Sequence, residues 1–338
     1  MRSSTALMAD TGVRLSDLQF PATRVHVQRT RLAYIHIDNL LHFSKIDRDG
    51  RIDGFVAAYL PDEVALLFLL GGNLATSVAI MERGREVLPI ATALERIHRE
   101  TERGELVFCE APREQLAWMY ASCAEERTPR PVALNEPELL FRSLKQEAYS
   151  GTLELISEGR VTYFSFEQGK FQSGHFCGKD EGASVSQHVE SLFRPVKRGA
   201  TPSVAATLFP LRADVPEQAP PAMVDRYRGL YWKITDTAEK HAAGEAAGRA
   251  AKVLGQVSGV HPSLGLIGAA RDGSPEPMVV SSEQLTAGLA EWAGQLLQQL
   301  EVIAPGVAPV ILRDATREHR FVLQKTGFFD KLPWSVNW

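Results

Sequence analysis

Hydrophobic and polar positions alternate in short blocks along this chain, and two of these blocks share one layout. Each consists of an apolar run, a polar break, a second apolar run and a glycine. The first block comprises residues 54–59, residues 64–68 and Gly72, and the second comprises residues 151–156, residues 161–165 and Gly169. Short apolar runs bounded by turn residues are typical of β-strands. The pattern predicts a strand–turn–strand–glycine unit that is used twice, at an offset of 97 residues (54 with 151, 72 with 169).

Each predicted hairpin is embedded in a similar order of helices and strands. Helices are expected where apolar positions recur at helical spacing. In the first module we expect a helix over residues 87–100, a strand over 104–108 and a helix over 114–125. In the second we expect a short helix at Leu139 and Leu140, a helix over 183–193 and a strand over 205–211. Residues 127–131 and the proline-bearing residues 213–222 are expected to be linkers.

The last third of the chain has a different composition and predicts a further domain. A long helix is expected over residues 227–257, with alanines and glycines spaced four apart. That stripe serves either packing within its own domain or a dimer seam, and packing is favoured. A hairpin over 264–280, a helix that begins at a capping box of Ser281 and Gln284, and short strands at 310–312 and 321–323 follow.

The predicted fold class is therefore α+β, with two tandem repeats of a small hairpin-plus-helix module and a C-terminal α+β domain that contains a long helix. The expected boundaries are a flexible lead-in over residues 1–30, repeats at 31–127 and 135–213, and the last domain at 223–338. A length of 338 residues agrees with about two or three domains.

Charge and cysteine usage narrow the classes of function. A net charge of -4 and a pI near 6.2 argue against a general affinity for nucleic acid, which needs a basic surface. Three widely spaced cysteines, Cys109, Cys123 and Cys177, form no disulfide framework, which favours a reducing cytoplasm. The N-terminal residues lack the apolar core of a signal peptide.

One uncharged stretch, residues 64–81, has the length of a marginal membrane helix. Gly71, Gly72 and Asn73 lie in its middle and are a strong hairpin signal. We therefore expect a buried hairpin here, and membrane association that is at most peripheral.

The polar residues do not form a recognisable catalytic or metal-binding motif. Residues 47–53 are similar to a calcium loop, but Lys45 and Val56 stand where the first and last acidic ligands belong. His175 and Cys177 lack two further zinc ligands nearby. Ser186 and His188, two apart on an expected helix, face away from each other. No catalytic residue, cofactor or metal is therefore expected.

The C-terminal end is unusually aromatic, with four aromatic residues among the last eleven. These side chains either fold back over a core or form an aromatic docking surface of the kind found in interface hot spots. The candidate partner-binding residues are Phe328, Phe329, Trp334 and Trp338.

The repeated unit resembles the PATAN-type domain of bacterial signalling proteins, which accompanies response regulators. In the second copy, Leu139 and Leu140 open the pattern, and residues 150–155 and 161–171 follow it. The first copy matches through Leu40 and Leu41, residues 53–55, 64–74 and 104–108, but carries Leu69 and Leu70 where the pattern prefers polar residues. The C-terminal region is similar, less closely, to the roadblock (dynein light chain) fold. The resemblances imply binding to other proteins and bring no catalytic residues.

These observations predict a non-catalytic, cytoplasmic scaffold or regulator in bacterial signalling that binds other proteins. The resemblances name a response regulator, a small GTPase or a larger complex as its partner, and a homodimer stays open. The alternative is a structural accessory subunit of a larger, membrane-associated assembly. A third hypothesis is an enzyme with a site in the C-terminal domain, built from His261, Asp272, Glu318 and His319. None of these residues has the spacing that catalysis requires.

Overall fold

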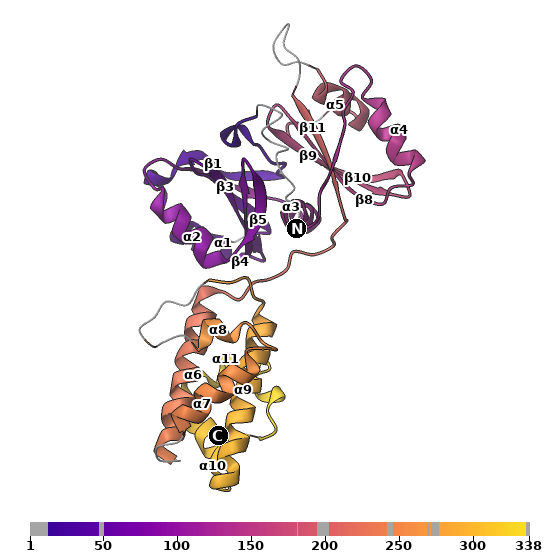
Figure 1. Cartoon of the computed structure of the whole chain (residues 1–338). Coiled ribbons are helices and arrows are strands. Elements are labelled where there is room, and N and C mark those ends of the chain that lie inside the picture. The colour runs from indigo at the N-terminus through magenta and orange to yellow at the C-terminus, as the bar shows by residue number, and fades with distance from the viewer. Residues whose placement is uncertain are drawn as a thin grey trace. The chain divides into compact units, whose positions relative to one another are not determined.

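The chain folds as an α+β protein with two compact units, as the expected class requires. The computed structural model describes residues 13–46, 51–180, 182–194, 203–241, 246–268, 271 and 277–335. The first unit comprises Met1–Leu88 and Thr92–Pro216, and the second comprises Pro89–Ala91 and Glu217–Trp338. The division at Pro216 falls within the expected linker over residues 213–222. Both expected modules belong to the first unit (Figure 1).

The first module is built on a six-stranded antiparallel sheet. Its strands are β1 (Arg24–Arg31), β2 (Gly54–Tyr59), β3 (Glu63–Leu70), β4 (Asn73–Met81), β5 (Gly84–Leu88) and β6 (Glu105–Glu110). They lie in the order β1-β6-β2-β3-β4-β5. The helices α1 (Ile37–Ile46) and α2 (Ile90–Arg99) contribute Leu40 and Ile97 to the core on one face of this sheet.

The second module is built on a five-stranded antiparallel sheet. Its strands are β7 (Thr128–Arg130), β8 (Gly151–Ser157), β9 (Arg160–Glu167), β10 (Lys170–Phe176) and β11 (Val204–Phe209). They lie in the order β10-β9-β8-β11-β7. The helices α4 (Glu138–Gln146) and α5 (Val185–Leu192) cover one face, with Leu144 and Leu192 in its core.

The two sheets share the order of four strands, and their hairpin turns are built alike. The orders β6-β2-β3-β4 and β11-β8-β9-β10 correspond strand by strand. Gly72 has a φ of +76°, and a Cβ there would lie 2.2 Å from the carbonyl oxygen of Ser44 in α1. Gly169 has a φ of +73°, and its Cβ would lie 2.6 Å from Cα of Lys145 in α4. Glycine is therefore needed at both turns, because each lies against the preceding helix. The duplication itself stays a prediction.

The uncharged stretch over residues 64–81 is a buried hairpin, as expected. Strands β3 and β4 pair antiparallel from Glu63 with Met81 to Leu70 with Asn73. Along β3, Leu66 and Phe68 point to one core and Leu67 and Leu69 to the other. Because both faces of the sheet are covered, the strand carries apolar residues at every position from Val64 to Leu70. Among the described residues, no helix combines the length and the apolar character needed to cross a membrane.

Helix α3 (Arg113–Ala124) lies between the two sheets. Residues 115–123 are all buried, in a core that also holds Phe68 of β3 and Tyr163 of β9. A helix that is enclosed on every side needs no polar face. The two modules therefore share one continuous core.

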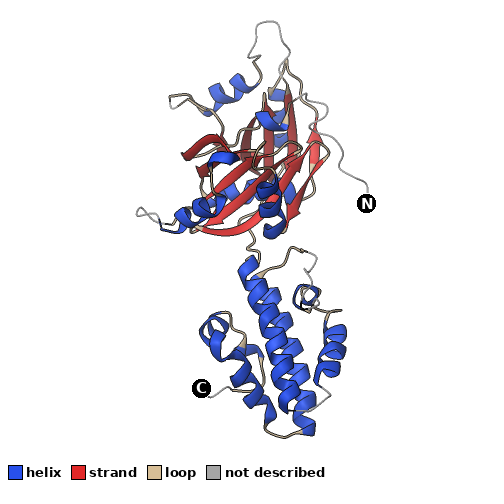
Figure 2. Cartoon of the chain, turned by 90° about the vertical axis from the view of Figure 1, so that its left-hand side faces the viewer, coloured by secondary structure: helices blue, strands red, loops and turns tan. Residues whose placement is uncertain are grey.

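Apart from loops and an isolated β-bridge between Gln218 and Ser281, the described secondary structure of the second unit is helical (Figure 2). Its helices are α6 (Pro221–His241), α7 (Ala246–Val257), α8 (Leu264–Ile267), α9 (Ser282–Ile303), α10 (Val307–Thr316) and α11 (Arg320–Lys325). The capping box of Ser281 and Gln284 begins α9, as expected. The long helix expected over residues 227–257 is instead divided into α6 and α7, which pack on each other. Of the expected small-residue stripe, Ala238, Ala246 and Ala250 are buried in the core of this unit.

The prediction of strands in this unit is wrong. Its described part is therefore not the α+β domain that the sequence led us to expect. Residues 310–312 belong to α10, where Ala308, Ile311, Leu312 and Ala315 are buried at helical spacing. Residues 321–323 belong to α11. Short apolar runs do not distinguish a strand from a buried helix. Residues 264–267 form α8 rather than a strand, and the expected turn at residues 272–274 lies outside the described residues.

Three further expectations are corrected in the first unit. The described part of the lead-in, residues 13–30, is ordered, because Leu15, Leu18 and Phe20 enter the inter-sheet core and β1 pairs with β6. The linker expected over residues 127–131 contains β7, which pairs with β11. The helix expected over residues 87–100 begins only at Ile90, and the strand β5 precedes it.

Candidate functional site

An aromatic pocket on the second module is the most prominent candidate site in the described chain. It has a volume of about 530 Å³ and lies between α4 and α5, with strands β9 and β10 beneath. Four phenylalanines line it: Phe141, Phe164, Phe166 and Phe171. Its size and apolar lining are those of typical binding pockets.

The phenylalanine rings support one another edge to face. The centroid of Phe164 lies 6.0 Å from that of Phe141 and 6.3 Å from that of Phe171. Phe166 and Phe171 also approach to 6.3 Å. Such geometry is the favoured one for aromatic pairs. Phe164 and Phe166 are buried, whereas Phe171 is 44% exposed and offers its ring at the surface.

A β-bulge in β10 places these rings. Phe171 pairs with Phe166 and Ser173 with Ser165, so Gln172 is the extra residue. Without a bulge, Phe171 and Phe176 would point to opposite faces, because side chains alternate along a strand. With it, both rings contact Phe164, at 6.3 Å and 5.5 Å between centroids.

The polar groups at the pocket are mainly acidic. Its charged lining residues are Glu138 of α4 and Glu190 of α5, and Ser186 adds a hydroxyl. Arg142 lies 3.9 Å from Glu138, and Arg194 lies 3.2 Å from Glu190. All four side chains are exposed, so these pairs are weak and their carboxylates stay accessible. A ligand that combines apolar groups with a positive charge fits this lining, because the rings contact the apolar groups and the glutamates attract the charge.

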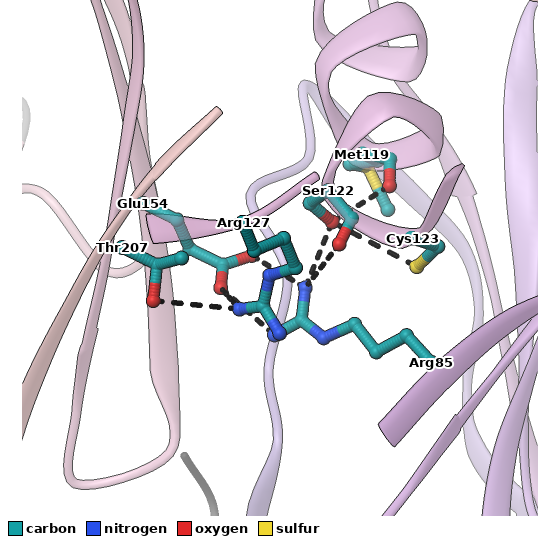
Figure 3. Close-up of polar contacts among 7 residues, drawn as sticks. All are labelled: Arg85, Met119, Ser122, Cys123, Arg127, Glu154 and Thr207. Carbon is teal, nitrogen blue, oxygen red and sulfur yellow. Dashed lines mark hydrogen bonds and ion pairs between the residues drawn. The ribbon is translucent and has the colours of Figure 1, made fainter. Parts of the chain in front are cut away.

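A second feature is a buried ionic cluster between the two sheets of the first unit. Arg85 of β5 forms a bidentate pair with Glu154 of β8, with both N–O distances at 2.8 Å. Arg127 donates to the same carboxylate at 2.9 Å. The Ser122 hydroxyl of α3 accepts from Arg85 at 2.8 Å, and Thr207 of β11 lies 3.5 Å from Arg127. Figure 3 shows both guanidinium groups converging on Glu154.

The cluster is charged at neutral pH although it is buried. Burial alone would raise the pKa of the Glu154 carboxyl, but the two guanidinium groups outweigh it and hold that pKa below its ordinary value. Burial and the neighbouring Arg85 lower the pKa of Arg127. The three side chains are buried and pair with one another across the two sheets, so the cluster joins the modules.

The aromatic residues of the C-terminal end differ in how far the structure buries them. Phe328 is fully buried in the core of the second unit, and Phe329 and Trp334 pack against that core. The fold-back alternative therefore describes these three side chains, and Phe328 is not accessible to a partner. Trp338 lies outside the described residues.

Other residues singled out in the sequence have structural partners. Asp53 accepts hydrogen bonds from the Gly71 amide and from Arg113, whereas residues 47–50 lie outside the described chain. His175 lies 3.5 Å from Glu114, and its ring is 4.9 Å from that of Trp118. Burial raises the pKa of the Cys177 thiol to about 11, which keeps it protonated. The described residues contain no group of three metal-ligating side chains.

Two residues of the enzyme hypothesis, His261 and Glu318, pair with side chains outside the set of four. His261 pairs with Glu291 at 2.9 Å, and Glu318 pairs with Lys233 at 2.7 Å. Burial lowers the pKa of His319, with Arg226 and Lys233 adding to the effect. Asp272 lies outside the described residues. His261 and Glu318 are therefore held by ion pairs with Glu291 and Lys233, which are not members of this set.

Sequence reasoning missed Arg85, Arg127 and Glu154 entirely. The one signal was a charged residue at the centre of a buried strand, where Leu153 and Leu155 on either side of Glu154 are buried in another core. Ser186 was considered only with His188, and the structure places it at the pocket instead.

Comparison with protein-family models, with curated proteins and with solved structures finds no match for this chain. The resemblances to PATAN-type domains and to the roadblock fold thus rest on the sequence pattern alone.

Proposed function

We propose that this protein is a non-catalytic scaffold or regulator of bacterial signalling that binds other proteins through the aromatic pocket of its second module. The observation that carries the proposal is the set of phenylalanines between α4 and α5, with the accessible ring of Phe171 at its mouth. Aromatic side chains in a pocket are a common anchor for a protein partner.

The remaining chemistry of the chain supports binding over catalysis. The buried ions Arg85, Arg127 and Glu154 neutralise one another in the inter-sheet cluster. The resemblance to PATAN-type domains also implies protein interaction in signalling. The three cysteines are free and buried, which agrees with a cytoplasmic setting.

The accessory-subunit alternative has less support than the scaffold. The apolar stretch over residues 64–81 is accounted for by β3 and β4 inside the first unit. Phe328 of the aromatic C-terminal end is accounted for by the core of the second unit.

The test is selection of peptides from a displayed random library against the purified full-length protein. Peptides that bind the aromatic pocket should bind the variant Phe171→Ser about 30-fold or more weakly than the natural protein. This is the loss expected for a hot spot worth about 2 kcal/mol. Phe321→Ser is the matched control, because Phe321 is an exposed phenylalanine of the second unit. Recovery of binders that are all indifferent to Phe171→Ser would refute the proposal.

A further inference from the structure

Strands β4 and β10 hold the same place in the two sheets, but only β4 has a neighbour on its outer side. Strand β5 pairs antiparallel with β4 from Ser77 with Leu88 to Met81 with Gly84. Strand β10 is the last strand of its sheet, and no described strand pairs with its outer edge. An unpaired edge presents backbone N–H and C=O groups that an additional strand can use.

The two strands also share the irregularity that precedes the paired segment. In β4 the register shifts between Phe68 and Leu69 of its partner strand, so that Ala75 is the extra residue. In β10 the extra residue is Gln172. Both bulges fall at the third residue of their strand, and β5 pairs with the part of β4 beyond the bulge. The corresponding part of β10 begins at Gly174.

The open edge of β10 adjoins the aromatic pocket. Phe171 belongs to this strand and lines the pocket, and its ring is the exposed one of the four. A strand added beside β10 would direct every second side chain to the face on which the pocket lies. Backbone pairing and side-chain insertion would then act together, as in known cases of strand addition.

We propose that the partner segment binds in an extended conformation, as an antiparallel strand beside β10 at the place that β5 takes beside β4. Its large apolar side chains, at alternate positions, enter the aromatic pocket. A lysine or arginine beside them meets Glu138 or Glu190, the charged residues of the lining. This inference rests on the proposed function and specifies the form of its partner.

Lys170 does not obstruct this arrangement. A lysine commonly protects an edge strand from unwanted pairing. Here it is the first residue of β10, before the bulge, whereas the segment that corresponds to the β5-paired part of β4 begins four residues later, at Gly174. Lys170 therefore lies next to the turn, and the edge of β10 from Gly174 onward stays open to pairing.

The experiment uses peptides from the library that bind the full-length protein and depend on Phe171. Sequencing should show apolar residues two apart with a flanking lysine or arginine. Methylation of the backbone amide at every second residue should weaken binding at least tenfold in one register and leave the alternate register unchanged. That asymmetry arises because only half of the amides of an added strand face its neighbour.

Two other results would overturn the inference while the proposed function stands. Phe171-dependent peptides with apolar residues three and four apart, which lose affinity on methylation in either register, would indicate a bound helix. A dimer in light scattering that Phe171→Ser converts to a monomer would show that a second copy occupies the pocket. By contrast, an absence of any Phe171-dependent peptide would count against the proposed function itself.

Discussion

Removal of the Glu154 carboxylate is the most direct test of how the two modules are joined. Glu154→Ala deletes the single acid between Arg85 and Arg127 and leaves both guanidinium groups in place. The Glu154 side chain is 1% exposed, and those of Arg85 and Arg127 are 4% and 12% exposed, so water cannot readily replace the lost partner. Burial of an uncompensated charge is among the few causes of a large loss of stability.

The expected loss in the free energy of unfolding is about 3–5 kcal/mol, the range for breaking a buried ion pair from one side. Three charge-assisted hydrogen bonds of 2.8–2.9 Å disappear together. The matched control is the triple variant Arg85→Met, Arg127→Met, Glu154→Leu. Replacement of a whole buried cluster by apolar side chains is often neutral or stabilising. The control should therefore remain within about 1 kcal/mol of the natural protein, or exceed it.

Hydrogen exchange followed by mass spectrometry suits this test, because the chain has two units and a two-state analysis of the whole chain is not justified. Faster exchange is expected in β8, β11 and α3, while α9 in the second unit serves as an internal reference. Equal exchange of the natural protein and Glu154→Ala would refute the reasoning. If the triple variant were as unstable as Glu154→Ala, the fit of the side chains at the cluster, and not the compensation of charge, would determine the free energy of unfolding.

Three further predictions can be checked by thermal or urea unfolding. Gly169→Ala should destabilise the first unit by about 1–3 kcal/mol through strain at a positive φ, whereas Gly84→Ala, with nothing within 4 Å of its Cβ, should change it by less than about 0.5 kcal/mol. Equal effects of the two glycine variants would contradict the role of the turn. Burial lowers the pKa of His188 below its ordinary value of 6.5, and the guanidinium groups lower that of Glu154 below 4.5. Both groups therefore resist protonation in the folded state, so stability should fall as the pH drops below 6.5 and fall again below 4.5. His188→Asn should reduce the first step, to which His175 and His319 also contribute because burial lowers their pKa values as well. Phe328→Ala should destabilise the second unit by about 3–5 kcal/mol, while Phe321→Ala, at an exposed position, should be nearly neutral.

The sequence allowed the hairpins and their turns to be predicted because local rules control them. Gly72 and Gly169 mark turns that only glycine fits, and the observed strand β2 has the bounds expected for it. The capping box of Ser281 and Gln284 was equally local. Each of these signals lies within a few residues, so that a single sequence contains all of it.

The cluster and the pocket could not be predicted in this way. Arg85 and Glu154 are 69 positions apart, and nothing near either residue identifies the other. The pocket is assembled from α4, two strands and α5, and its rings converge because of a bulge at Gln172. In the second unit, Ile311 and Leu312 fit a strand or a buried helix equally well, and packing with neighbouring helices decides between them.

The enclosure of α3 has a consequence for synthesis of the protein. This helix is complete at Ala124, but much of the surface that covers it, through Phe209 of β11, follows later in the chain. At roughly 5–20 residues per second, a ribosome needs on the order of several seconds to supply that surface. During this interval the helix has an uncovered apolar side, and the nascent chain is exposed to aggregation or capture by a chaperone. The first module by itself therefore leaves part of the apolar surface of α3 uncovered, although its sequence has the outline of an independent domain.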